Sequence, residues 1–232
     1  MIVKLFGLKE SGIDYLAWLL NENFKNITIL RSHTGWEHGE LILTYESDYT
    51  KWKCNDLTDP MLSSEKEKEA LSFNTENLNS GKPLSYYVEE IKSLYDTGEL
   101  PLLIVLRNPY IWLHEYCVKN LKDGEYRILE RAMRMWNGIN RDYIDMPWSQ
   151  QHYIKYEKLV SNSEIELQRM SDFLGVGIAG DIKTNPNILN TTINTTQLIK
   201  EICEHEGITE EIFQTMFDDI IEKRILDWYI KL

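Results

Sequence analysis

The first thirty residues switch from a strand-like to a helix-like pattern of hydrophobic positions and back. Residues 2–6 are a short apolar run that ends at Gly7, which predicts a strand. In residues 13–24, leucine or phenylalanine stands three, four and eight positions after Leu16, the spacing of a helix buried on one face. Residues 27–30 are β-branched or apolar and predict a second strand. This βαβ order predicts a parallel sheet with a right-handed crossover.

The later part of the chain repeats these two patterns. Residues 101–106 are continuously apolar, as in a central strand buried on both faces, and Pro109 suits the first turn of a following helix. Ser163 and Glu166 have the spacing of a capping box, which predicts the start of another helix, and Gly175 predicts its end. The same criteria predict a helix around residues 129–139, a strand over 152–157, an irregular loop over 185–196, and two closing helices at about 196–205 and 209–223.

The composition is that of a folded, acidic domain. The chain has 232 residues, against about 150 for an average domain, and no repeat or linker interrupts it, so we expect one domain over residues 1–232. Hydrophobic residues make up 43%, enough for a sizeable core. The net charge of −12 excludes nucleic-acid binding through the overall field, because that requires Lys and Arg to displace counterions from phosphates. An anionic ligand therefore needs a local site that works against the global potential.

Neither a signal peptide nor a bilayer-spanning segment is predicted. The most hydrophobic stretch, residues 101–106, is far too short to cross a bilayer. Cys54, Cys117 and Cys203 are odd in number and widely spaced, which argues against a disulfide framework and against a zinc site. We therefore expect a cytoplasmic protein with reduced thiols, no metal and no membrane partner.

A loop bounded by glycines follows the first predicted strand. Gly7 and Gly12 have the spacing of a phosphate-binding loop, in which backbone N–H groups and the dipole of the next helix attract an anion. A plain strand-to-helix turn can have the same spacing. In nucleotide triphosphatases the second glycine is followed by Lys and by Ser or Thr, whereas Ile13 and Asp14 follow here, which disfavours a P-loop kinase.

Three segments, in order along the chain, resemble the sulfotransferase family. Residues 6–16 are similar to its first signature, in which a basic residue, a small hydroxyl residue and Gly precede a helix. Residues 103–110 resemble the second signature, an apolar strand that ends in Arg-Asn-Pro. Residues 154–160, a strand and a Tyr-Glu-x-Leu turn, and the Phe-Leu-Gly at 173–175 resemble a later part of the family's pattern.

The resemblance implies a fold, a cofactor and an activity. The fold is an α/β three-layer sandwich: a central parallel sheet flanked by helices, with a P-loop-like strand–loop–helix at the N-terminus. The cofactor is PAPS (3′-phosphoadenosine 5′-phosphosulfate), which leaves as PAP, and the acceptor is a hydroxyl of a small molecule or carbohydrate. The expected cofactor-binding residues are Lys9, Glu10, Ser11, Gly12, Ile13, Asp14 and Arg107. Lys9 would also act in catalysis, over the leaving phosphate, while Arg107 would hold the 3′-phosphate.

Four positions depart from the family's pattern. Glu10 separates the basic residue from the hydroxyl residue, and Ile13 and Asp14 replace polar residues that touch phosphate in the family. Glu115 stands where the family has a Ser that donates to the 3′-phosphate. A carboxylate beside a phosphate is repulsive by on the order of a kcal/mol. The alternative hypothesis is therefore a sulfotransferase-like binding or regulatory module that no longer transfers the group.

The general base is expected in the segment that follows the second predicted strand. There His38 lies in a Gly-Trp-Glu-His-Gly sequence similar to the Gly-Trp-Lys-His-Gly of some bacterial-type sulfotransferases. His38 is the expected catalytic base, and Glu37 and His33 are the alternatives. His114, on a predicted helix, and His205, among acidic residues, are expected to be structural or surface residues.

Overall fold

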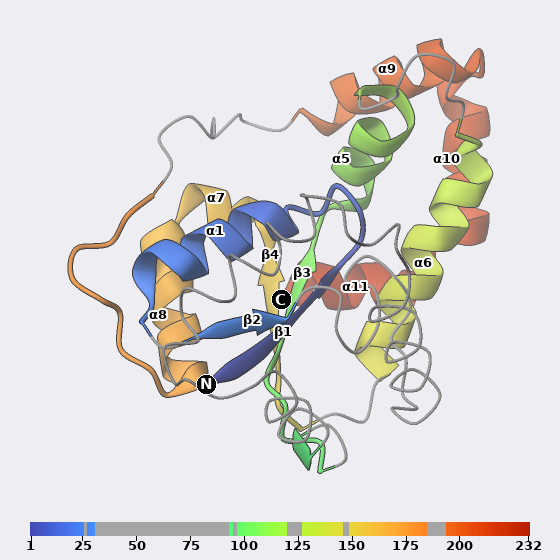
Figure 1. Cartoon of the computed structure of the whole chain (residues 1–232). Helices are drawn as coiled ribbons and strands as arrows, with labels where there is room; N and C mark the ends of the chain where they lie inside the picture. Colours follow the sequence, from blue (N-terminus) through green and yellow to red (C-terminus); the bar gives the residue numbers. More distant parts are fainter. Residues whose placement is uncertain (26, 31–92, 95–96, 120–126, 146–148, 185–193) are drawn as a thin grey trace, which may run out of the picture.

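A computed structural model describes residues 1–25, 27–30, 93–94, 97–119, 127–145, 149–184 and 194–232. These residues form an α/β fold whose centre is a four-stranded sheet (Figure 1). The strands are β1 (Ile2–Gly7), β2 (Thr28–Leu30), β3 (Leu102–Leu106) and β4 (Gln151–Lys155). Their order across the sheet is β2-β1-β3-β4, and every pairing is parallel.

The strand order places a topological switch point between β1 and β3. From β1 the chain crosses to β2 on one side, and it later returns to β3 on the other side. Register pairs Gly7 with Val105 and Leu106 with Lys155, so β1, β3 and β4 end at the same edge of the sheet. In open parallel sheets, ligands bind beyond the carboxyl ends of the strands at such a switch point. A ligand is therefore expected at the loops after β1 and β3.

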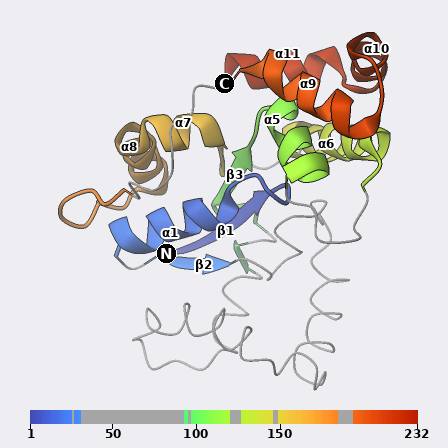
Figure 2. The ribbon, with the colours of Figure 1, turned by 90° about the horizontal axis from the view of Figure 1, so that it is seen from above.

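Alternate side chains of the strands enter two separate cores. Val3, Leu5 and Val105 pack under α1 (Ile13–Asn23) and α8 (Ser163–Leu174). On the opposite face, Phe6 and Ile104 join a cluster formed mainly by the other helices. Those helices are α5 (Pro109–His114), the π-helix η1 (Glu115–Lys119), α6 (Leu129–Asp145), α9 (Thr195–Glu206), α10 (Glu210–Ile220) and α11 (Lys223–Lys231). Figures 1 and 2 show the three layers, with α1, α7 (Tyr156–Ser161) and α8 on one face. The predicted α/β sandwich is confirmed.

Two predicted boundaries near β4 are wrong. The strand expected over residues 152–157 ends at Lys155, because its partner β3 ends at the paired Leu106, and the chain turns into α7. Ser163 does not cap α8: Asn162 stands at the N-cap, and the Ser163 hydroxyl donates to the carbonyl of Leu159 at 2.6 Å. Ser163 is the first residue inside the helix, and its hydroxyl is directed to a carbonyl of the preceding helix, α7.

Three helices, not two, close the chain. The predicted last helix is interrupted after Ile220, where Ile221 is extended and buried in the core. Asn137 holds the interruption, because its side chain accepts from the Glu222 amide at 2.9 Å and donates to the Glu222 carboxylate at 3.2 Å. Of the loop predicted over 185–196, residues 185–193 lie outside the described part of the chain, and α9 begins at Thr195.

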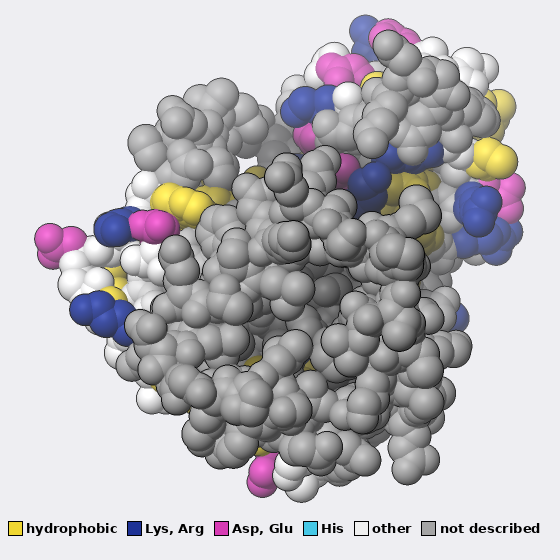
Figure 3. Space-filling model, viewed as in Figure 1, with side chains coloured by type: hydrophobic (Ala, Val, Ile, Leu, Met, Phe, Trp, Pro, Cys, Tyr) yellow, Lys and Arg dark blue, Asp and Glu magenta, His cyan; other side chains and the backbone are white. Residues whose placement is uncertain are grey.

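The acidic C-terminal helices carry basic partners on their surface. Figure 3 shows Lys and Arg side chains beside Asp and Glu on this lobe, at the upper right. Lys200 pairs with Glu204 at 3.8 Å, and Arg141 of α6 pairs with Glu222 at 3.0 Å. None of the described helices combines the length and the apolar character that a membrane crossing requires.

Both described cysteines, Cys117 and Cys203, are buried free thiols in the core beside α6, as the sequence predicts. Burial, with a smaller contribution from Glu206, raises the pKa of Cys117 to about 12, so this thiol stays protonated. Cys54 lies outside the described residues.

His152 of β4 is predicted to make the protein sensitive to acid. Its ring stacks on Phe173, and its Nε2 is buried without a hydrogen-bond partner among the described residues. Burial first, and then the positive charge of Arg169, lowers the pKa of His152 in the folded state. The unfolded chain therefore takes up this proton first, so the stabilising contribution is full above about pH 6.5 and is lost as the pH falls through the folded pKa.

Urea unfolding between pH 7.5 and pH 5 measures this contribution. His152→Phe, which keeps an aromatic ring against Phe173, is expected to flatten the loss of unfolding free energy in this range. His205→Phe, at an exposed histidine, is the control. Its unfolding free energy should depend on pH with the same slope as that of the unaltered protein. Equal slopes for His152→Phe and the unaltered protein would contradict the assignment.

Candidate anion-binding site

Residues 8–12 make a tight turn between β1 and α1. The Ser11 amide donates to the Leu8 carbonyl at 2.9 Å, and Glu10 and Gly12 have positive φ angles of 66° and 95°. A left-handed conformation is uncommon for a residue other than glycine, so Glu10 is held there by its surroundings.

Two donors from beyond β3 hold the backbone of this loop. The indole Nε1 of Trp112 in α5 donates to the Lys9 carbonyl at 2.6 Å. The guanidinium Nη1 of Arg107, the first residue after β3, donates to the next carbonyl, that of Glu10. In a trans peptide the N–H points opposite to the C=O, so the amide that follows the Lys9 carbonyl points away from α5. The two bonds thus orient the loop and join the two sides of the switch point.

The first turn of α1 has features of an anion-binding site. Gly12 stands at its N-cap, and no side chain among the described residues caps the helix. The first N–H groups of a helix have no intrahelical partner, and the helix dipole makes this end attractive to negative charge. The Ser11 hydroxyl is also buried, with no hydrogen-bond partner among the residues that the structure describes. Donors of this kind can bind an anionic group such as a phosphate.

The two glycines of the loop are required by close contacts. A Cβ at Gly7 would lie 2.5 Å from the Ser11 hydroxyl and 2.8 Å from the Val105 carbonyl. A Cβ at Gly12 would lie 2.1 Å from the ring of Tyr156, which follows β4. The loop is therefore packed between the ends of β3 and β4.

Arg107 lies in this site, and its guanidinium already contacts other groups of the chain. Besides the Glu10 carbonyl, its guanidinium contacts the ring of Tyr156 at 4.7 Å and the carboxylate of Glu115 at 3.9 Å. Its Nε is buried and has no hydrogen-bond partner among the described residues. Burial raises the pKa of Tyr156, while Arg107 lowers it. The guanidinium is thus positioned for an anion, with Glu115 as an internal competitor.

The structure brings part of the predicted set together. Lys9, Glu10, Ser11 and Gly12 share the loop, and Arg107 is bonded to it. The Lys9 side chain is exposed, Glu10 is half-buried and Ser11 is buried. The side chain of Ile13 packs in the core below α1, so this residue offers an anion its backbone alone, and Asp14 is exposed.

The predicted base and its alternatives, His38, Glu37 and His33, lie outside the described residues. The two histidines expected to be structural or surface residues both pair with carboxylates: His114 lies 2.7 Å from Glu201, and His205 lies 3.2 Å from Glu206. The first pair joins α5 to α9, whereas the second joins two neighbouring residues within α9.

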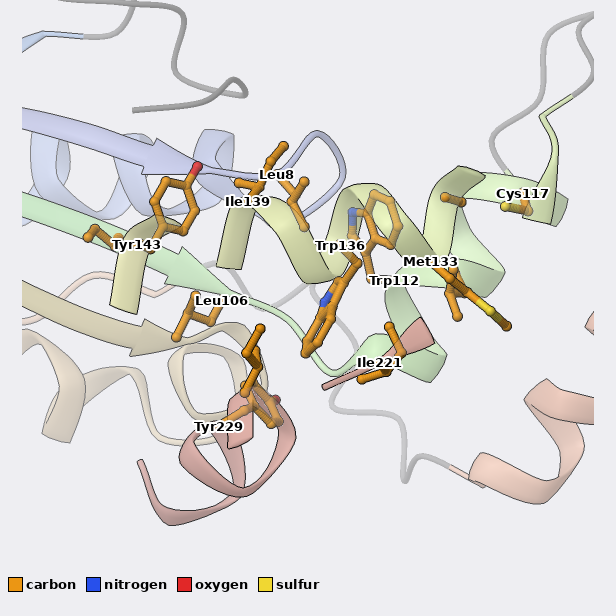
Figure 4. Packing of buried hydrophobic residues seen from close by; sticks show 14 of the residues in the cluster. Leu8, Leu106, Trp112, Cys117, Met133, Trp136, Ile139, Tyr143, Ile221 and Tyr229 are labelled. Carbon is orange, nitrogen blue, oxygen red and sulfur yellow. The ribbon is translucent and has the colours of Figure 1, made fainter. Parts of the chain in front are cut away.

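Sequence analysis missed the tryptophans that support the site. Trp136 of α6 donates to the Arg107 carbonyl at 3.2 Å, while Trp112 donates to Lys9. Figure 4 shows both indoles in the cluster beside the ends of β1 and β3. One feature of the sequence could have pointed to Trp112. A buried indole N–H needs a hydrogen-bond acceptor, and Trp112 follows Arg107 by little more than one helical turn, so it lies near the site.

No family model matches the chain, and the comparison with curated proteins found no match. Among solved structures, the sulfotransferase domain of the Synechococcus PCC 7002 olefin synthase is 16% identical, with a TM-score of 0.43, over 90% of this chain and 88% of that one. The sulfotransferase domain from the curacin biosynthetic pathway is also 16% identical, with a TM-score of 0.41, over 83% of this chain and 78% of that one. These likenesses are loose, and the fold described above rests on its strand order and layers.

Gly12→Ala is predicted to lower the unfolding free energy more than the same substitution at another glycine in the left-handed conformation. The change adds the clash with Tyr156 to the conformational cost of about 1–2 kcal/mol for an L side chain in this region. Gly175→Ala is the matched control, because Gly175 has a φ of 65° and nothing within 4 Å of a new Cβ. Urea denaturation compares the two. An equal loss of unfolding free energy in both variants would show that Tyr156 does not pack on Gly12.

Proposed function

We propose that this chain is a sulfotransferase that binds PAPS and transfers its sulfuryl group to a hydroxyl of a small molecule or carbohydrate. The observation that carries the proposal is the joining of the uncapped α1 N-terminus and Arg107 at the β1–β3 switch point. Two of the three segments that resemble the sulfotransferase family supply these groups, and Tyr156 of the third packs between them.

The donor would be held by groups on both sides of the switch point. The first-turn amides of α1 and the Ser11 hydroxyl would bind the 5′-phosphosulfate, and Arg107 the 3′-phosphate. Lys9, whose side chain is exposed beside the loop, would offset negative charge on the leaving phosphate. The bound donor supplies the sulfuryl group. His38 is proposed as the base that takes the acceptor's proton.

The contacts that Arg107 already makes favour a second candidate function, a binding module without transfer activity. Its guanidinium contacts Glu10, Glu115 and Tyr156 within the chain itself. A nucleotide would have to displace the Glu115 carboxylate or share Arg107 with it. Release of PAP from PAPS over a panel of phenols and sugars distinguishes the two, because a module would bind PAP and release none.

Opposite changes at the Arg107–Glu115 contact test the proposal. In calorimetry with PAP, Arg107→Ala is expected to weaken binding about 10- to 100-fold through the loss of charged hydrogen bonds. Glu115→Gln is expected to tighten binding about five- to tenfold, because a competing negative charge is removed.

Glu130→Gln is the matched control, since it removes the same charge from an exposed pair with Arg134 on α6. This variant should bind PAP like the unaltered protein. No binding of PAP to the unaltered protein at millimolar concentration would refute the proposed function. Unchanged affinity in both Arg107→Ala and Glu115→Gln would place the nucleotide elsewhere.

A further inference from the structure

The Tyr156–Glu157 pair that follows β4 holds Arg107 in two different ways. The ring of Tyr156 supports the guanidinium. The Glu157 carboxylate reaches the backbone instead: its Oε1 accepts from the amide of Asn108 at 3.0 Å.

The peptide that follows Arg107 is thereby fixed on both sides. Its C=O accepts from the Trp136 indole at 3.2 Å, and its N–H donates to Glu157. Because a peptide is planar, two hydrogen bonds at its opposite ends determine its orientation. The direction in which the Arg107 side chain leaves the backbone therefore depends on Glu157.

The other oxygen of the same carboxylate belongs to the C-terminal helix. Glu157 Oε2 accepts from the Tyr229 hydroxyl of α11 at 2.7 Å. Burial, and then the Glu157 charge, raises the pKa of Tyr229 far above its ordinary value, so the phenol keeps the proton that it donates. Lys155 and Lys158, on either side, donate to the carbonyls of Ile230 at 3.1 Å and Leu232 at 2.9 Å.

We propose that Glu157 is a positioning residue for Arg107 and that it couples the docking of α11 to anion binding. The rigid carboxylate of Glu157 bonds both to Tyr229 of α11 and to the Asn108 amide. A displacement of α11 therefore pulls on the Asn108 amide. By linkage, an anion that fixes Arg107 must strengthen the docking of α11 to the same degree. The identity of the anion rests on the proposed function, whereas the bridge from α11 to the Arg107–Asn108 peptide does not.

A double-mutant cycle separates this coupling from a general loss of stability. Tyr229→Phe removes one hydroxyl and keeps the ring, and it should weaken PAP binding roughly three- to tenfold. Glu157→Ala should weaken binding on the order of tenfold or more, because it leaves two donors unpaired. In the Glu157→Ala background, Tyr229→Phe should have no further effect. Glu157→Gln should stay within about threefold of the unaltered protein, since its amide can bond to both neighbours.

Tyr153→Phe is the matched control. It also removes a phenol hydroxyl, which donates to the Tyr143 carbonyl of α6 at 2.7 Å and does not touch Glu157. It should lower the unfolding temperature and leave PAP affinity unchanged. Equal effects of Tyr229→Phe with and without Glu157, or an affinity loss in Tyr153→Phe as large as in Tyr229→Phe, would overturn the proposal.

Hydrogen exchange at the Asn108 amide gives a readout that needs no nucleotide. Exchange should be faster in Tyr229→Phe and in Glu157→Ala, and unchanged in Tyr153→Phe. If the unaltered protein does not bind PAP, the proposed function fails and this exchange decides the coupling alone. Unchanged exchange in Tyr229→Phe would show that α11 does not act on the Arg107 peptide.

Discussion

The site depends on the pair of hydrogen bonds that reach across the switch point to the Lys9 and Glu10 carbonyls. Trp112 and Arg107 supply them, from residues that lie 103 and 97 positions away along the chain. These donors help to hold Glu10 in its left-handed conformation, with a φ of 66°. With them, the Lys9 carbonyl faces Trp112 of α5 and the Glu10 carbonyl faces Arg107 at the end of β3. Trp136 and Glu157 extend the same arrangement by fixing the peptide that carries Arg107.

Charge distribution explains how such a site can exist in a chain with a net charge of −12. On the C-terminal helices, acidic residues such as Glu204, Glu210 and Asp218 are exposed to solvent, and Glu204 and Glu222 pair with Lys200 and Arg141. At the site itself, the favourable potential comes from a helix dipole, backbone amides and one guanidinium. Glu115 opposes it, at 3.9 Å from Arg107. The affinity for an anion is thus set by a small local balance, which one carboxylate can change.

The elements of the fold follow closely from hydrophobic patterning. Apolar runs predicted β1 and β3, and the helical spacing after Leu16 predicted α1, because burial on one or two faces leaves a periodic trace in the sequence. The end of β4 at Lys155 left no such trace, since it depends on where the partner strand ends. The interruption at Ile221 was also missed, because Asn137 holds it from another helix.

Candidate chemistry was predicted less completely than the fold. Local motifs predicted Ser11, Gly12 and Arg107 as site residues, because a loop sequence and a strand end are local features. The supporting contacts of Trp112, Trp136 and Glu157 are hydrogen bonds between distant segments. The sequence contains these donors and acceptors but does not show which of them pair. From the sequence alone, a tryptophan is expected to be a core residue.

Amide chemical shifts during a titration with PAP measure the central claim most directly, namely that an anion binds at the joined α1 N-terminus and Arg107. The account predicts the largest shifts at the amides of residues 10–14 and at the Arg107 Nε–H, which is buried and has no partner in the described part of the chain. Saturable shifts centred on any other surface, with these signals unmoved, would contradict it.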